Sequence, residues 1–265
     1  MKERNRLFCL FCAIFIACFI LSAYATPEPD AYGWYVVRNS EHKQPALDAN
    51  MRFIEDNGAF YVDRAHSDGD EEKVIYLTFD AGYENGNVAK ILDTLKARGV
   101  RGAFFILDNM ITDNTELIKR MADEGHTVCN HSMNHKDMST LSREEFTHEL
   151  LGLESLYTEY TGGELAKYYR PPEGRFTEEN LKWAESIGYK TVFWSFAYED
   201  WNNDKQPSRE YAMNKILSNI HNGAVILLHP TSATNAAILD RLISELKSMG
   251  YRFGVLDEIE VDAKT

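Results

Sequence analysis

The sequence contains little cysteine outside its first residues. Three of its four cysteines, Cys9, Cys12 and Cys18, lie near the N-terminus, and only Cys129 follows them. A single thiol cannot form an intramolecular disulfide, so we expect the folded domain to be stabilised by its hydrophobic core alone. The chain has 265 residues, of which 44% are hydrophobic, and this is enough for one large core.

The chain also lacks the features of nucleic-acid-binding and nucleotide-binding proteins. Its formal net charge is -13, whereas a nucleic-acid partner would require a basic face. We find no glycine-rich phosphate loop, internal repeat or low-complexity tract. These absences exclude nucleic acid as the expected partner.

The N-terminus resembles an export sequence. Residues 1–6 are rich in Lys and Arg, and residues 7–25 then run without a charge and end with small residues at Ala23 and Ala25. A basic start, an apolar run and a small-x-small end are typical of a signal peptide. The apolar run is also long enough to span a bilayer. We therefore expect residues 1–25 to be a signal peptide or a membrane tether, and the protein to be secreted or anchored outside the cytoplasm.

Strand-like and helix-like segments alternate from Val74 onward, after an irregular extension at residues 26–73. Short apolar runs typical of buried strands occupy residues 74–79, 102–107, 126–130, 166–170, 190–195, 224–229 and 251–256. Segments with helical periodicity lie between them, at residues 87–100, 115–125, 142–160, 177–188, 208–223 and 235–250. The alternation predicts an α/β domain over residues 74–260 whose parallel sheet is either open or closed into a barrel.

Polar residues with reactive side chains follow five of these apolar runs. In chain order they are Asp80, then Asn130 with His131 and His135, then Arg170, Asp200 and His229. One aspartate after a strand is usually a helix cap or a turn former. Five strand ends that each carry such a group indicate a shared site, because the carboxyl ends of parallel strands meet at one rim.

Three of the motifs suggest particular chemistry. In "HSMNH", His131 and His135 are four residues apart, and on a helical turn both imidazoles would share one face, a spacing used for zinc. Such a pair is also common on ordinary surfaces. In "RPPEG", two prolines hold Arg170 and the Glu173 amide rigidly, although the segment could be an ordinary loop. A lone His229 after an apolar strand is more often a core residue than a catalyst.

Taken together, the motifs resemble those of a known family. "TFDAG", "HSMNH", "RPPEG", "EDW" and "LLH" occur in this order over about residues 74–256, as they do in the polysaccharide deacetylases, or NodB-homology family. "GWYVVRNSEHKQP" and "TFDAGYENG" are similar to segments of the peptidoglycan N-acetylmuramic acid deacetylases of spore formers. The resemblance implies a distorted (β/α) barrel of about seven parallel strands. It also implies hydrolysis of an N-acetyl group in the peptidoglycan glycan strand, followed in the spore cortex by muramic lactam formation.

The resemblance implies a role for each motif residue. Asp80 corresponds to the general base and Arg170 to its ion-pair partner. His229 corresponds to the general acid and Asp200 to the carboxylate that orients it. The remaining positions are the metal ligands His131 and His135, the oxyanion donor Glu173 through its amide, and the walls of the acetyl slot, Trp201 and Leu227.

Ala81 departs from the family pattern. The family usually has a second acid here, which completes a His-His-Asp metal site, whereas alanine has no ligating atom. Fewer protein ligands lower the affinity for a metal ion. We expect a weakly held divalent ion, with zinc the expected metal. Two alternatives stay open, namely completion of the site by Asn85 or Asn130, and a metal-independent mechanism.

Two other functions stay open on the sequence. One is deacetylation of N-acetylglucosamine in peptidoglycan or chitin-like chains. The other is a non-catalytic glycan-binding protein, in which Ala81 would be a sign of decay. Tyr169 and Trp194 lie close to the motifs and could belong either to the wall of the site or to the core.

Overall fold

The predicted alternation of strands and helices is present in the computed structural model, which describes residues 31–260. The expected signal peptide or anchor at residues 1–25 lies outside the described residues. The strands are β1 (Tyr32–Gly33), β2 (Lys73–Ala81), β3 (Ala103–Ile106), β4 (Thr127–Asn130), β5 (Ala166–Tyr169), β6 (Arg175–Phe176), β7 (Lys190–Thr191), β8 (Ala224–Leu228) and β9 (Tyr251–Phe253). The helices are α2 (Phe53–Asp56), α3 (Val88–Arg98), α4 (Asp108–Asp113), α5 (Thr115–Asp123), α6 (Arg143–Thr161), α7 (Glu178–Ser186), α8 (Arg209–Leu217) and α9 (Ala233–Ser248).

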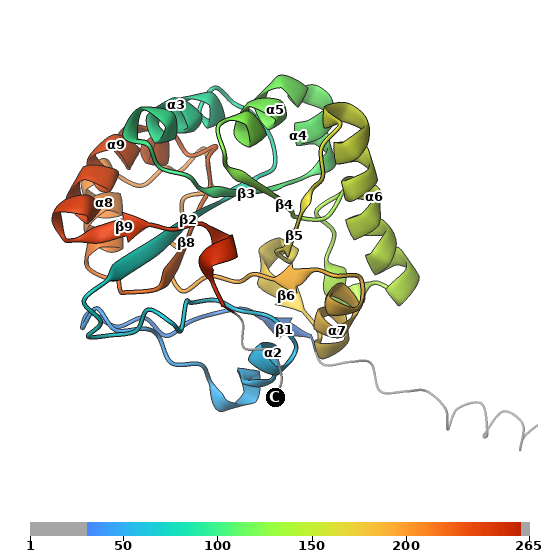
Figure 1. Ribbon diagram of the computed structural model, residues 1–265, viewed down its shortest axis with the longest axis horizontal. Coiled ribbons are helices and arrows are strands. Elements are labelled where there is room, and N and C mark those ends of the chain that lie inside the picture. Colours follow the sequence, from blue (N-terminus) through green and yellow to red (C-terminus); the bar gives the residue numbers. More distant parts are fainter. Residues whose placement is uncertain (1–30, 261–265) are drawn as a thin grey trace, which may run out of the picture. The chain divides into compact units, whose positions relative to one another are not determined.

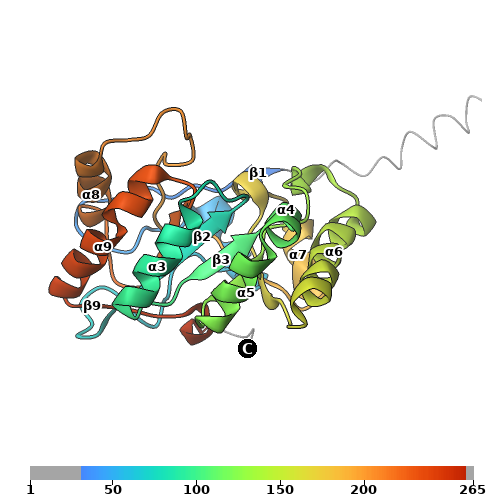
Figure 2. The same cartoon turned by 90° about the horizontal axis from the view of Figure 1, so that it is seen from above.

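A parallel sheet forms the centre of the molecule. Within residues 31–260 it has seven strands in the order β7-β5-β4-β3-β2-β8, with β9 paired to the first residues of β2. Figure 1 shows the sheet curled, with helices around its outside, and Figure 2 shows α9, α3 and α5 side by side along one flank. Each apolar run predicted to be a strand contains one strand of this sheet. The predicted α/β class with about seven parallel strands is therefore confirmed.

The N-terminal extension closes part of the gap between β7 and β8. The Phe60 amide donates to the Thr191 carbonyl at 3.0 Å, and the Phe193 amide donates to the Phe60 carbonyl at 2.8 Å. On the other side, the Asp63 amide donates to the Gly223 carbonyl at 2.9 Å. Residues from Ala31 onward belong to one compact unit. The extension is thus irregular in sequence, but its backbone hydrogen bonds join it to the central sheet.

Strand β2 is buried over almost its whole length because both of its faces are covered. Its outward side chains, which include Leu77 and Phe79, pack in the core between the sheet and the helices. Tyr76 belongs to the separate core inside the curled sheet. Buried parallel strands are expected to be nearly continuous apolar runs, so a carboxylate at their end is conspicuous. Asp80, the last residue but one of β2, is such a carboxylate and is 8% exposed.

Two helices begin with capping boxes directly after segments that carry motif residues. Ser142 and Glu145 satisfy each other's backbone amides at the start of α6, and Thr177 and Asn180 do so at the start of α7. Such caps fix where a helix begins and each contributes on the order of 1 kcal/mol. None of the helices within residues 31–260 has the length and apolar character needed to cross a membrane.

Candidate active site

An ion pair between Asp80 and Arg170 forms the buried base of the site. Arg170 Nη1 donates to Asp80 Oδ1 at 2.7 Å, and the arginine side chain is fully buried. Burial alone would raise the pKa of Asp80, but the positive charge of Arg170, together with His131 and His229, holds the pKa below its ordinary value. The carboxylate is therefore ionised at neutral pH, and its second oxygen lies 3.6 Å from His131 Nε2.

The Arg170 guanidinium is held on all sides. Its Nε donates to the Val192 carbonyl at 3.1 Å, and its Nη2 donates to Thr78 Oγ1 at 2.9 Å. The guanidinium also stacks over the Phe105 ring, with Cζ 4.1 Å from the ring centroid. Because its donors have fixed partners on the surrounding strands, Arg170 can orient Asp80 but cannot swing into the pocket.

A second pair, His229 and Asp200, lies across the pocket. Asp200 Oδ1 is 2.7 Å from His229 Nδ1, and its Oδ2 accepts from the His229 amide at 2.8 Å. Asn235 Nδ2 donates to the same Oδ2 at 2.6 Å. Since Nδ1 is engaged by Asp200, the Nε2 atom is the one available to a substrate. Burial would lower the pKa of His229, but the hydrogen bond and charge of Asp200, with the charge of Asp80, raise it above its ordinary value.

The two histidines of "HSMNH" come together, although on an irregular loop and not on a helical turn. Residues 131–137 form an irregular loop in which Ser132 and His135 have positive φ angles of 69° and 52°. This backbone turn brings the ring centroids of His131 and His135 within 5.1 Å of each other. Left-handed residues interrupt any helical path here, so the helical turn considered for this spacing is not formed. The pairing of the imidazoles does not depend on it.

His131 has the protonation state of a metal ligand. Its Nδ1 donates to the Arg170 carbonyl at 2.8 Å, which leaves Nε2 unprotonated and facing Asp80. Burial is the main cause that lowers the pKa of His131 to about 4, so the imidazole is neutral at pH 7. A neutral imidazole held in one tautomer by a backbone carbonyl is the usual geometry of a metal-binding histidine.

The two proposed completions of the metal site do not fit the structure. Asn130 is fully buried, its Nδ2 donates to the Leu150 carbonyl, and its Oδ1, the possible ligand atom, accepts from the Ser132 amide. The Asn85 side chain donates to the Thr231 carbonyl at 2.8 Å. Ala81 is buried in the core between the sheet and the helices. Within residues 31–260, no group of three His, Cys, Asp or Glu side chains is arranged to hold a metal ion. The imidazoles of His131 and His135 are suitable donors for a divalent ion, and water would have to supply its other ligands.

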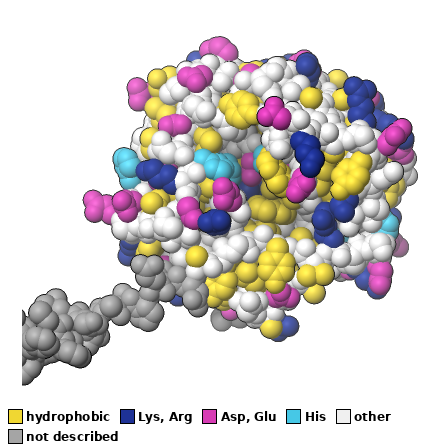
Figure 3. All heavy atoms as spheres, turned by 180° about the vertical axis from the view of Figure 1, so that it is seen from behind, with side chains coloured by type: hydrophobic (Ala, Val, Ile, Leu, Met, Phe, Trp, Pro, Cys, Tyr) yellow, Lys and Arg dark blue, Asp and Glu magenta, His cyan; other side chains and the backbone are white. Residues whose placement is uncertain are grey.

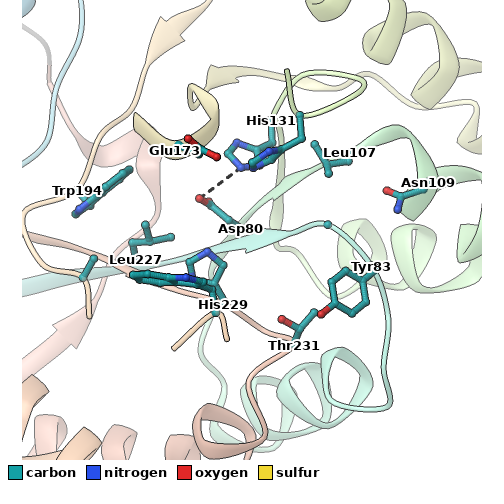
Figure 4. A pocket seen from close by; sticks show the side chains of 14 residues that line it. Asp80, Tyr83, Leu107, Asn109, His131, Glu173, Trp194, Leu227, His229 and Thr231 are labelled. Carbon is teal, nitrogen blue, oxygen red and sulfur yellow. Dashed lines mark ion pairs between the residues drawn. The ribbon is translucent and has the colours of Figure 1, made fainter. Parts of the chain in front are cut away.

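Asp80, His131, His135 and His229 line one pocket of about 620 Å³, shown in Figure 4. In this view Glu173 and His131 lie on one side of Asp80, and Leu227 and His229 lie on the other. The lining residues are Asp80, Gly82, Tyr83, Leu107, Asn109, His131, His135, Glu173, Trp194, Ala197, Trp201, Leu227, His229 and Thr231. In Figure 3, which shows the molecule from behind, histidine and hydrophobic side chains border a hollow.

The three residues predicted to contact the substrate all line this pocket. Glu173 has a φ of 55° in the tight turn at residues 172–174. Leu227 is 5% exposed, whereas Trp201 is 53% exposed and its ring centroid lies 5.9 Å from that of His229. An exposed aromatic ring beside His229 offers a surface on which a sugar ring can stack. Trp201 therefore stands at the mouth of the pocket and Leu227 in its wall.

The structure separates the two aromatic residues that the sequence left ambiguous. Trp194 lines the pocket, whereas Tyr169 is 1% exposed and packs edge-on against Phe146 with centroids 5.7 Å apart. Sequence reasoning missed Asn235, which holds Asp200, and Tyr83 at the rim. Asn235 lies in the first turn of α9, where an asparagine suggests no more than helix capping, so no sequence signal would have found it.

Comparisons with known proteins identify the family and its fold. The polysaccharide deacetylase family model matches residues 67–192. The chain is 39% identical over 254 residues to the peptidoglycan-N-acetylmuramic acid deacetylase PdaA of Bacillus subtilis strain 168, covering 95% of this chain and 94% of PdaA. The solved structure of B. subtilis PdaA, a family 4 carbohydrate esterase, matches with a TM-score of 0.82 and 38% identity over 88% of this chain and 98% of PdaA.

Two further relatives have different functions. The peptidoglycan-N-acetylglucosamine deacetylase PgdA of Listeria monocytogenes strain 10403S is 35% identical over 187 residues, covering 71% of this chain and 39% of PgdA. A family 4 pseudoenzyme of Bacillus anthracis matches with a TM-score of 0.66 and 29% identity over 72% of this chain and 66% of that one. Similarity therefore extends to proteins that act on another sugar and to one described as a pseudoenzyme.

Proposed function

The chain belongs to the polysaccharide deacetylase family, and from this premise we propose that it hydrolyses the N-acetyl amide of N-acetylmuramic acid in peptidoglycan. The observation that carries the proposal is the pair of opposed groups in one pocket. The charge of Arg170 lowers the pKa of Asp80 and so keeps it ionised, whereas Asp200 raises the pKa of His229. Amide hydrolysis needs a base for the attacking water and an acid for the departing amine, and these two residues supply them.

In the first half of the reaction, Asp80 accepts a proton from a water molecule while the oxygen of that water attacks the acetyl carbonyl carbon. Arg170 keeps the carboxylate charged and directed into the pocket. The backbone amide of Glu173 lies in a left-handed turn of the lining and is our proposed donor to the developing oxyanion. Leu227 and Trp201 are the proposed walls of the slot for the methyl group, and Trp194 also lines the pocket.

In the second half, the carbon–nitrogen bond breaks and the amine nitrogen takes a proton from His229. The hydrogen bond from Nδ1 to Asp200 directs the Nε2–H of the imidazolium toward the pocket. The products are acetate and the free amino sugar. Because the pKa of His229 is above its ordinary value, more of the imidazole carries the required proton at neutral pH.

A weakly held divalent ion, zinc by expectation, is part of this proposal. His131 and His135 would hold it, and when bound it would supply positive charge that polarises the acetyl carbonyl and the attacking water. The proton transfers described above are made by the protein's own side chains. The affinity is expected to be low because Ala81 contributes no ligand.

The proposal is tested by incubating the purified protein with peptidoglycan glycan strands freed of peptide. Acetate release and mass analysis of the digested glycan should show loss of an acetyl group from muramic acid. Loss from glucosamine would instead support the N-acetylglucosamine alternative. Binding to the glycan without acetate release would support the non-catalytic alternative.

We also propose that the protein acts outside the cytoplasm, either secreted or tethered through residues 7–25. The freed amine of muramic acid can then attack the lactyl carboxyl of the same sugar and close a lactam with loss of water, as in the spore cortex. Fractionation of cells that produce the full chain, followed by N-terminal sequencing, would show where the protein resides and whether residues 1–25 are removed.

A further inference from the structure

The N-terminal extension packs against segments that form one side of the pocket. The Trp34 amide donates to the Gly174 carbonyl at 2.8 Å, and its Nε1 donates to the Trp194 carbonyl at 2.9 Å. Its ring stacks on Phe193 with centroids 4.4 Å apart. A Cβ at Gly174 would lie 2.9 Å from both Trp34 and Trp194, so these segments fit tightly. The extension is therefore firmly fixed beside the Glu173 turn and the Trp194 wall.

Four residues further along the same segment, Arg38 reaches the rim of the pocket. Its Nη1 donates to the carbonyl of the lining residue Ala197 at 2.7 Å. Its Cζ lies 5.5 Å from the ring centroid of Phe196, which is fully buried. The guanidinium is thus held at the rim by two contacts, while its remaining N–H groups are available to a ligand.

The charge of Arg38 has no partner among the described residues. Among residues 31–260, no Asp or Glu oxygen lies within 4.0 Å of its guanidinium. Arg175, near the Glu173 turn, differs in this respect, because it pairs with Asp137 at 2.9 Å and with Glu173 at 3.2 Å. In a chain with a net charge of -13, an arginine without a carboxylate partner beside the pocket favours an anionic group of the substrate.

N-Acetylmuramic acid carries such a group. Its lactyl ether is attached to the ring carbon next to the one that bears the acetamide. A residue that contacts the lactyl group must therefore lie on the wall or at the rim of the pocket that contains Asp80 and His229. The lactyl carboxyl is a free anion only when the stem peptide has been removed, and it is an uncharged amide when the peptide is attached.

We infer that Arg38 is a specificity-determining residue that binds the free lactyl carboxylate of peptide-free N-acetylmuramic acid. This inference rests on the proposed function and adds the group that recognises the substrate. Two guanidinium N–H groups can hold a carboxylate in a planar arrangement that a lysine does not reproduce. The extension would then select the sugar, while the strand ends carry out the chemistry.

The test compares two substrates, the peptide-free glycan and the same glycan with its lactyl carboxyls converted to primary amides. Wild-type protein should prefer the free acid. Arg38→Gln keeps a donor for the Ala197 carbonyl but removes the charge, and it should raise KM for the free acid about tenfold with kcat almost unchanged. Its KM for the amidated glycan should stay as in the wild type. Arg38→Lys should restore only part of the preference.

Arg52→Gln is the matched control, because Arg52 is an exposed arginine of the same extension whose side chain, unlike that of Arg38, makes no hydrogen bond to a lining residue among residues 31–260. It should leave KM for both substrates unchanged, and thermal unfolding should confirm that every variant is folded. Equal loss on both glycans in Arg38→Gln, or no loss on either, would overturn the inference. Failure of the wild-type protein to release acetate from either glycan would instead overturn the proposed function.

Discussion

A buried carboxylate lies at each of the two ends of the parallel strands, and the two carboxylates have different partners. Near the start of β8, Asp63 is fully buried, and its oxygens are taken by the Tyr76 hydroxyl, by His66 Nδ1 at 2.6 Å and by the Ala65 amide at 2.9 Å. At the opposite end of the strands, Asp80 has one oxygen on Arg170, and its other oxygen faces the pocket.

The difference lies in what remains free for a substrate. The hydrogen bonds of Asp63 connect the extension to β2, so this group stabilises the fold. Asp80 is just as well oriented, but only on one side. A buried carboxylate whose second oxygen borders a cavity can accept a proton from a bound water, whereas one with both oxygens engaged cannot. The comparison therefore predicts that one site is important for catalysis and the other for stability.

The largest effect is expected at Asp80 and His229. Asp80→Asn and His229→Gln should each lower kcat for acetate release by about 10³-fold or more, because general base and general acid catalysis are lost. Each replacement is close in size to the native residue, so urea unfolding should show a folded protein. Substantial remaining activity in either variant would mean that the proton is handled by another group.

A smaller loss is expected when a metal ligand is removed. His131→Ala should lower activity by about 10- to 100-fold and raise the metal concentration needed for half-maximal rate. Wild-type protein treated with a chelator should regain its activity on addition of zinc. If metal-stripped wild-type protein kept full activity in chelator, the ion would have no part in the reaction.

The pH dependence should report the Asp200–His229 pair. Asp80 must be ionised and its pKa is lowered, so activity should fall only below the ordinary carboxyl range. His229 must be protonated and its pKa is raised, so activity should persist above pH 6.5 and fall as pH rises through the raised value. Asn235→Ala removes a hydrogen bond that holds Asp200 in place, and it should lower kcat about tenfold and change the position of the alkaline limb. An unchanged alkaline limb would show that Asn235 does not act through His229.

The smallest effect on catalysis is expected at the other end of the sheet. Asp63→Ala should lower the free energy of unfolding by about 2–3 kcal/mol, because the Tyr76 hydroxyl and the His66 ring lose a buried partner. Its kcat at a temperature where the variant is folded should match that of the wild type. A loss of kcat in the folded variant would break the contrast between the two ends.

The regular part of the fold could be predicted because its signals are local. The apolar run before Asp80 and the periodic segment that became α3 each contain their own evidence in neighbouring residues. The extension could not be predicted in this way. Phe60 pairs with residues beside β7 and Asp63 with the start of β8, and such long-range pairs leave no periodic pattern in the sequence.

The same distinction applies to the candidate site: residues with a local signal could be predicted, and those placed by long-range contacts could not. Residues at strand ends, such as Asp80, Arg170 and His229, were identifiable because the topology of a parallel sheet brings strand ends together. The loop that joins the two histidines of "HSMNH" could not be predicted, because the spacing alone does not reveal the positive φ of His135. Asn235 supports Asp200 from a helix start and could be recognised only in three dimensions.

The backbone bonds of residues 60–63 have a consequence for the order of folding. This segment leaves the ribosome early, yet its partners at Thr191, Phe193 and Gly223 are synthesised much later. Contacts between distant parts of a chain form slowly, because a long loop must close first. We expect residues 60–63, although synthesised early, to form their native backbone hydrogen bonds in the last step of folding.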